Sequence, residues 1–258
     1  IQAKDAQSLL EKVSKLGILH VEHLNTPKGD KLSALSKDLA LLGQAISLLE
    51  GIDKKKVVDT GTKQAAEWDV LARHVIDLNK RMQQLQEYSI TLSSKIEKLK
   101  EWGDFDPQEI SRLGLSGISV GFYKLSDEQI SQLPEGVYLE KVSSKGSMHN
   151  CVIFTQADIG IPFKAVELPK DSLTRMQKRL AEDIKTAELL KADFLRQAVY
   201  LEFLRGIRNK VTNEIKFYEA WAGMAQDGDL MYIKGYIPFD SKDRIEEAAR
   251  SWGWAVLT

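Results

Sequence analysis

Two histidines flank a glutamate near the N-terminus, in the segment His20-Val21-Glu22-His23. A zinc site needs imidazoles that converge with further ligands. On a strand, His20 and His23 are three residues apart and point to opposite faces, and no other His or Cys lies near them in sequence. We therefore predict no metal site, and we interpret both histidines as surface or strand-end residues.

Cys151 is the one cysteine of the chain, so the sequence excludes an intrachain disulfide framework and fits a reducing compartment. His149 lies two residues before it, on the same face if the strand is regular. A Cys–His nucleophile also needs a lowered thiol pKa, an orienting group and a cleft, and the sequence indicates none of them. We interpret Cys151 as a buried structural residue.

Neither phosphate-binding pattern, G-x-x-x-x-G-K-[ST] or G-x-G-x-x-G, occurs in the chain. The run Lys54-Lys55-Lys56 is short for a nucleic-acid or lipid patch. Arg205, Arg208 and Lys210 could form such a patch, although a solvated helix face is the interpretation we favour. With 36 basic and 37 acidic side chains, the net charge of −1 gives no reason to expect nucleic acid. The sequence thus predicts a mechanical or scaffold protein without catalytic residues, cofactor or metal.

A long hydrophobic repeat organises the chain. Its apolar residues are spaced alternately three and four apart, with only Ser89 out of pattern: Trp68, Leu71, Val75, Leu78, Met82, Leu85, Leu92, Ile96 and Leu99. Such a heptad repeat is typical of a helix that lies along a partner helix. No Pro interrupts residues 62–102, so we predict one helix of about 40 residues, roughly 60 Å long. Thr62 is its expected N-cap, and Trp102-Gly103 its expected end.

A second repeat, over residues 171–222, supplies the partner. Its positions are Leu173, Met176, Leu180, Ile184, Ala187, Leu190, Phe194, Ala198, Leu201, Leu204, Ile207 or Arg208, Val211, Ile215 and Tyr218. The successive four-residue steps from Met176 to Leu180 to Ile184 form a stutter, which locally unwinds a supercoil. We therefore predict a single return helix in a bent antiparallel coiled coil, with Gly206 as a second place for a kink.

Shorter elements precede, separate and follow the two repeats. The expected helices cover residues 5–16 (closed by Gly17), 31–50, a start at Asp106-Pro107, a short turn from Ser126, and 240–251. The expected strands cover residues 18–22, 137–142, 151–155, 163–168, 230–238 and 254–257. Because the long helices return the chain to its start, the N-terminal and C-terminal elements should share one lobe.

The predicted fold class is therefore α+β and mainly helical: a long antiparallel, bent coiled coil with an α/β lobe at each end, a dumbbell. The predicted domains are a proximal lobe with its leading helix (1–61 and 226–258), the coiled coil (62–103 and 170–225) and a distal lobe (104–169). The sequence has no run of 18 apolar residues and predicts no membrane span. It begins at Ile1 without a signal peptide, so we expect a trimmed N-terminus; a cut at Thr258 is equally compatible.

Candidate partner-binding residues lie near the C-terminus. Tyr236, Pro238 and Trp252 could expose an apolar patch, although burial at a lobe junction is an equal alternative.

Several segments resemble one family. Leu16-Gly17-Ile18-Leu19-His20-Val21-Glu22 is similar to the "LGxxHxE" opening of subunit I of V-type ATP synthases, the equivalent of eukaryotic subunit a. Lys234-Gly235-Tyr236-Ile237-Pro238 resembles its "xGWxP" segment, with Tyr236 in place of Trp. Trp102-Gly103-Asp104-Phe105-Asp106-Pro107 resembles its exit from the outbound coil. The order of these motifs around two heptad helices identifies the chain as the N-terminal cytoplasmic half. The family's opening strand, expected before Ile1, is missing, which supports a trimmed N-terminus.

The resemblance implies a stator role at the cytoplasmic face of the membrane. It implies peripheral-stalk heterodimers as partners at both lobes, the central-rotor-capping subunit as a further partner at the proximal lobe, and a membrane half beyond Thr258 that carries the ion channel. The proton-translocating residues of the family are absent from this sequence. The main alternative is a coiled-coil arm or hinge of a nucleic-acid-associated machine, which salt-dependent DNA affinity would indicate. An enzyme with a hidden site in the distal lobe is a third hypothesis.

Overall fold

The structure is a computed structural model of the chain, and it describes residues 2, 5–52, 67–156, 159–167 and 170–257. The fold is α+β. The chain divides into two compact units: unit 1 comprises residues 1–79 and 194–258, and unit 2 comprises residues 80–193.

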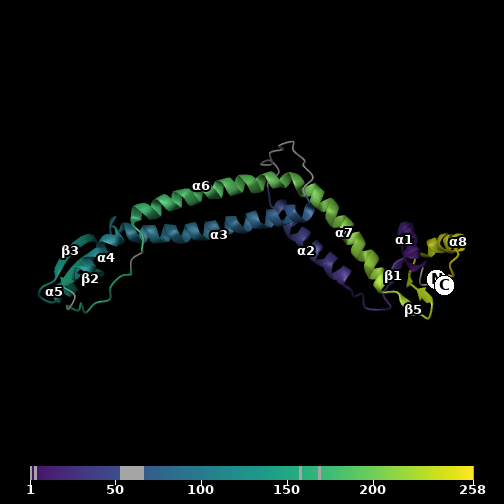
Figure 1. The fold of residues 1–258 in the computed structure, drawn as a ribbon, viewed down its shortest axis with the longest axis horizontal. Coiled ribbons are helices and arrows are strands. Elements are labelled where there is room, and N and C mark those ends of the chain that lie inside the picture. The colour runs from purple at the N-terminus through teal and green to yellow at the C-terminus, as the bar shows by residue number, and fades with distance from the viewer. Residues whose placement is uncertain (1, 3–4, 53–66, 157–158, 168–169, 258) are drawn as a thin grey trace. The chain divides into compact units, whose positions relative to one another are not determined.

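The elements are labelled in Figure 1. From the N-terminus they are α1 (Ala6–Leu16), β1 (His20–Glu22), α2 (Asp30–Glu50), α3 (Trp68–Lys100), α4 (Pro107–Leu115), β2 (Ile118–Ser126), α5 (Asp127–Ser131), β3 (Tyr138–Lys145) and β4 (Met148–Gln156). The remaining elements are α6 (Leu173–Gln197), η3 (Ala198–Tyr200), α7 (Leu201–Ala222), β5 (Ala225–Asp227), β6 (Leu230–Tyr232), β7 (Lys234–Tyr236), η4 (Phe239–Ser241) and α8 (Lys242–Trp252).

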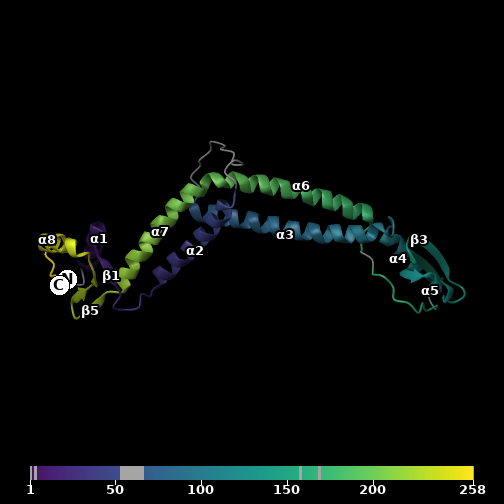
Figure 2. The same cartoon turned by 180° about the vertical axis from the view of Figure 1, so that it is seen from behind.

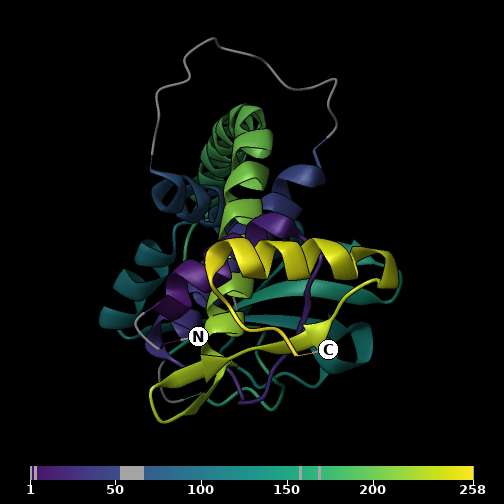
Figure 3. The same ribbon diagram turned by 90° about the vertical axis from the view of Figure 1, so that its right-hand side faces the viewer.

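The first and last strands of unit 1 pair with each other. β1 is antiparallel to β7, with Val21 opposite Gly235. This confirms the expectation that the two ends of the chain build shared structure. α1 packs on the C-terminal end of α7 through a core that joins Leu9, Leu10 and Val13 to Ala220 and Met224. Figure 3 looks onto α8, in yellow, with the yellow-green β5–β6 hairpin below it.

Two predicted strands near the C-terminus are wrong. The expected strand 230–238 is split, because β6 pairs with β5 through a turn at Gly228 (φ 57°) whereas β7 pairs with β1. The expected strand 254–257 does not form. The Trp254 N–H donates to the Ala249 carbonyl at 2.9 Å, so it closes the C-terminus of α8, where Gly253 adopts φ 73°.

α2 and α7 pack along each other in unit 1, as Figure 2 shows from behind. Leu42 and Leu204 have no exposed surface, and Arg205 donates to Glu50 of α2 at 2.6 Å and to Glu202 at 2.6 Å. These bonds, that to Glu50 foremost, raise the pKa of Arg205. The sequence prediction had placed residues 31–50 in the proximal lobe. Among the described helices, α2 alone is long and apolar enough to cross a membrane by length and composition.

The return segment is not one helix, contrary to the prediction. A turn of 3₁₀-helix, η3, separates α6 from α7, and the Leu201 N–H donates to the Ala198 carbonyl. The predicted kink at Gly206 is also wrong, because α7 continues through it. The outbound helix α3 begins at Trp68 and ends at Lys100; the predicted N-cap, Thr62, lies outside the described residues.

Within unit 2, α3 and α6 run antiparallel. The C-terminal turns of α3 share a core with the start of α6: Leu92, Ile96, Leu99 and Trp102 pack with Met176. Asp104, just after α3, accepts bonds from the hydroxyl and the backbone N–H of Thr174. The Thr174 hydroxyl is the main reason why the pKa of Asp104 is lowered.

A three-stranded antiparallel sheet, in the order β2-β4-β3, completes unit 2. The Phe122 ring on β2 lies 5.5 Å from Trp102, edge-on, and 5.0 Å from Phe105, stacked, so one face of the sheet covers the core at the α3–α6 end. Gly146 (φ 64°) turns the β3–β4 hairpin. Ser126 and Gln129 form the capping box that starts α5.

The predicted strand 163–168 is wrong for its described residues, 163–167, which carry no strand. The segment lies beside β2, where the Val166 N–H donates to the Phe122 carbonyl at 2.7 Å. Pro162 precedes it and has no N–H to donate, which limits a ladder at this edge.

Candidate partner-binding surface

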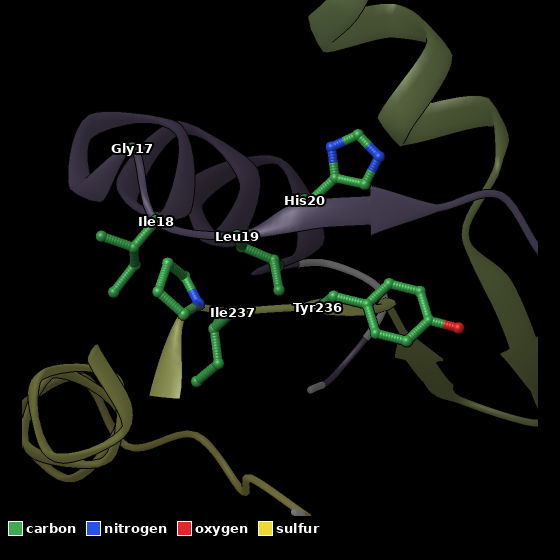
Figure 4. Close-up of a pocket in the computed structure, with 7 residues that line it drawn as sticks. Gly17, Ile18, Leu19, His20, Tyr236 and Ile237 are labelled. Carbon is green, nitrogen blue, oxygen red and sulfur yellow. The ribbon is translucent and has the colours of Figure 1, made fainter. Parts of the chain in front are cut away.

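Two of the three predicted partner-binding residues line one open pocket. Tyr236 ends β7, and Pro238 follows two residues later. Figure 4 shows the pocket, which has a volume of about 510 Å³ and is lined by Gly17, Ile18, Leu19, His20, Tyr236, Ile237 and Pro238. All of these residues belong to unit 1. The pocket offers aliphatic walls with one imidazole and one phenol at its edge.

Two glycines bring the walls of this pocket together. Gly17 adopts φ 66° and ends α1, so the chain turns directly into Ile18 and Leu19. At Gly235 a Cβ atom would lie 2.3 Å from the His20 carbonyl oxygen. The strand pairing therefore requires a residue without a side chain at position 235.

We expect Gly235→Ala to destabilise unit 1 by about 1–3 kcal/mol, because the added methyl group overpacks the β1–β7 contact. Chemical denaturation measures the loss. Gly206→Ala is the matched control: it is exposed in α7, and nothing lies within 4 Å of its added Cβ. That variant should gain about 0.5–1 kcal/mol. Equal effects of the two substitutions would contradict the close-approach explanation.

A strip of exposed large apolar side chains runs past the pocket. Along residues 230–236 exposure alternates: Leu230, Tyr232 and Tyr236 are 55%, 51% and 64% exposed, whereas Met231 and Ile233 pack on the core of unit 1. Phe239, just beyond, is 90% exposed. We name Leu230, Tyr232, Tyr236 and Phe239 the aromatic strip. Sequence analysis found Tyr236 but missed the others, although the alternation of residues 230–236 was a usable signal.

The third predicted residue, Trp252, lies outside the pocket. Its ring centroid is 4.8 Å from that of Trp254, and Lys12 Nζ lies 5.6 Å from the Trp252 centroid. Half of the predicted alternative thus applies, since Trp252 is half-buried at a junction between α1 and α8.

One ion pair fastens the strand that carries the strip. Lys234 Nζ lies 3.0 Å from Glu22 Oε2, across the β1–β7 pair. The hydrogen bond to Glu22 is the largest of the effects that raise the pKa of Lys234. Lys234 is therefore held to its own sheet and leaves the aromatic strip as the outward apolar surface.

The two N-terminal histidines have separate surroundings. His20 lines the pocket, whereas His23 packs on Gly223, where a Cβ would lie 2.4 Å from Nδ1. Within the described part of the chain, no group of three His, Cys, Asp or Glu side chains is placed to hold a metal ion.

Cys151 and His149 in unit 2 do not form a nucleophile pair. Cys151 has no exposed surface, and its thiol donates to the His149 carbonyl at 3.7 Å. Burial is the main cause that raises the pKa of this thiol, which opposes formation of a reactive thiolate. The His149 ring is bonded elsewhere.

Instead, His149 joins the β3–β4 hairpin to α5. Its Nδ1 lies 2.7 Å from Ser144 Oγ, and its Nε2 lies 3.0 Å from Asp127 Oδ1. Lys141 Nζ also donates to Asp127 Oδ1 at 3.0 Å. Although hydroxyl, imidazole and carboxylate stand in the order of a catalytic triad, the hydroxyl is on Nδ1 and the carboxylate on Nε2, the reverse of the serine-protease arrangement. We interpret the group as a structural clasp.

Acid should weaken unit 2. Lys141 first, and then His149, lower the pKa of Asp127; Lys124 likewise lowers that of Glu101. A lowered native pKa gives stability that is present above the unfolded pKa, about 4, and is lost as pH falls through the native value.

We therefore expect hydrogen exchange in the β3–β4 hairpin to quicken, relative to its intrinsic rate, as pH falls from 5 to 3. Asp127→Asn should start with weaker protection at pH 5 and lose less of it. A variant that loses as much as the native chain would contradict the role of Asp127.

Comparison with known proteins identifies similar chains. V-type ATP synthase subunit I 1 of Treponema pallidum is 22% identical over 276 residues, covering 99% of this chain and 44% of the relative. V-type ATP synthase subunit I of Borreliella burgdorferi is 22% identical over 261 residues, covering 98% of this chain and 42% of the relative. The resemblance to subunit I of V-type ATP synthases is confirmed. The chain spans less than half the length of these relatives.

A solved structure is also similar. It is described as the cytoplasmic N-terminal domain of subunit I, homolog of subunit a, of V-ATPase; it is 15% identical, covers 97% of this chain and 95% of its own, and superposes with a TM-score of 0.43. No family model matches the chain.

Proposed function

We propose that this chain is the soluble cytoplasmic half of a stator subunit in a rotary, ion-translocating V-type ATPase or ATP synthase. Support comes from alignment of 99% of the chain with a relative named subunit I. The chain would be non-catalytic and would lie at the cytoplasmic face of the membrane. It would link a membrane-embedded ion channel, carried by the rest of a longer subunit, to the peripheral stalks.

The aromatic strip is the observation that carries the partner assignment. Aromatic side chains dominate the centres of protein interfaces, because they bury much area at low entropic cost. Phe239 at 90% and Tyr236 at 64% exposure are large apolar groups left in water, and the adjoining pocket can accept an apolar side chain from a partner. We assign this surface, with Pro238 at its edge, to a peripheral-stalk heterodimer.

A stator must also resist torque. Paired helices suit this task, since each pair shares a continuous apolar seam: α2 with α7 in unit 1, and α3 with α6 in unit 2. The role further requires an α/β lobe at each end of the helical part. That dumbbell, with the domain boundaries given above, remains a prediction.

Unit 2 offers a second candidate contact. Leu115 at the end of α4 is 91% exposed, and Tyr138 at the start of β3 is 64% exposed. We assign this region to a second stalk heterodimer, and we retain the rotor-capping subunit as a further partner of the proximal lobe.

The test is a pull-down of the chain with the two peripheral-stalk subunits of the same organism. A second form, with residues 105–169 replaced by a short turn, separates the two predicted contacts. We expect the full chain to capture the heterodimer and the shortened form to retain less of it. Failure of both forms to bind would contradict the stator role, and DNA binding would then be measured at low and high salt.

A further inference from the structure

The seam of α6 contains a charged residue. The side chains of α6 that are not exposed in unit 2 are Leu173, Met176, Leu180, Asp183, Ala187 and Leu190. Their spacing is alternately three and four, an unbroken heptad in which Asp183 takes the place predicted for Ile184, which is 49% exposed. The stutter predicted at Leu180 is therefore wrong, because the seam continues through an aspartate rather than through the next apolar residue.

The partner helix is also polar in this region. On α3, the half-buried or buried positions are Met82, Leu85, Ser89, Leu92, Ile96 and Leu99. Arg179 lies over the Tyr88 ring, 5.4 Å from its centroid, and the helices are antiparallel. Asp183, one turn after Arg179, therefore faces the turn of α3 that contains Leu85 and Ser89.

Burial in the seam falls off from its sheet-proximal end to this section. Leu92, Ile96, Leu99 and Met176 are 6%, 4%, 1% and 5% exposed. By contrast, every seam position from Met82 to Ser89 and from Leu180 to Leu190 is only half-buried. The small side chains of Ser89 and Ala187 leave less apolar area to bury there.

The Asp183 carboxylate adds a cost. Its Oδ2 atom is buried, and no donor in the described part of the chain forms a hydrogen bond with it. A polar oxygen removed from water without a hydrogen bond opposes the closed state of the helix pair. Opening of this section would return the oxygen to water.

We propose that Asp183 and Ser89 make the middle of the α3–α6 pair a locally weak section, which opens in the native protein while the end next to the sheet stays closed. Local opening of this kind occurs where few apolar contacts hold a segment. A single polar residue in a coiled-coil seam is known to trade stability for another property. Here that property is a place where the two helices can part or shift without disturbing the sheet.

Hydrogen exchange followed by mass spectrometry on the full chain tests this proposal. In the native chain, peptides covering 82–90 and 180–190 should exchange at least 10-fold faster than peptides covering 92–99. Asp183→Leu should slow exchange in the weak section by at least 10-fold and leave 92–99 within about 3-fold. Ser89→Leu changes the other polar position and should act in the same direction, which keeps the test independent of how one variant folds.

Glu182→Leu is the matched control, since the neighbouring side chain is exposed and off the seam; it should change neither region. Equal protection of the two regions in the native chain would overturn the proposal. So would Asp183→Leu and Ser89→Leu variants that both fold and exchange at the native rate.

Discussion

Replacing Tyr236 and Phe239 together by aspartate should lower the affinity of the chain for the peripheral-stalk heterodimer on the order of 100-fold or more. Both side chains are largely exposed, so the loss would come from the interface. Two buried aromatic anchors are typically worth several kcal/mol, and 100-fold corresponds to about 2.7 kcal/mol. Biolayer interferometry with the immobilised chain measures the dissociation constant.

Val70→Asp is the control for this experiment. Val70 is an apolar side chain of unit 1, 55% exposed on α3, and it lies outside the aromatic strip. It should leave the affinity within about 3-fold, since single surface changes outside an interface are close to neutral. Equal losses in the two variants would refute the assignment of the strip and would indicate a non-specific effect of added charge.

Truncating the α2–α7 seam should have the largest effect on stability. Leu42→Ala and Leu204→Ala should each lower the free energy of unfolding by about 2–5 kcal/mol, because both side chains have no exposed surface and their removal leaves a cavity. Denaturant titration followed by tryptophan fluorescence measures the change. It samples unit 1 well, since Trp68, Trp221, Trp252 and Trp254 all lie there.

Ser47→Ala provides the comparison on the same helix. Its side chain is exposed on α2, so the change should stay within about 0.5 kcal/mol. If Leu42→Ala cost no more than Ser47→Ala, α2 would not be held against α7 through that residue, and the pairing of these helices would be in doubt.

Local chemistry explains which elements could be predicted from the sequence. The glycine after α1, the acidic and proline start of α4, and the capping box of α5 act within a few residues, and the structure has all of them. The heptad of α3 was equally readable, because its apolar spacing sets which face is buried. Even its irregular member, Ser89, keeps its place in the seam.

Elements that depend on distant partners could not be predicted in this way. Residues 230–236 look like one strand, and only the presence of β5 on one side and β1 on the other divides them. The apolar pattern of residues 254–257 indicates a strand, but Trp254 is used to close α8. In the return repeat, Ile184 is the apolar choice, and only the structure reveals that Asp183 faces α3.

The candidate site was found in part. Tyr236 and Pro238 came from a motif, and the structure places them together at one pocket. Phe239 was overlooked because a lone aromatic before a helix usually packs into a core, whereas here it is 90% exposed. Exposure depends on what covers a residue, and sequence spacing does not contain that information.

Site-specific photocrosslinking tests the central claim, that the aromatic strip contacts a peripheral stalk, most directly. A photoreactive phenylalanine analogue at position 239, introduced into the full-length subunit in its own assembled complex, should crosslink to a stalk subunit. The same analogue at position 70 should not. Crosslinks from position 239 that lead only to other subunits, or none at all in a complex shown to be intact, would contradict the assignment.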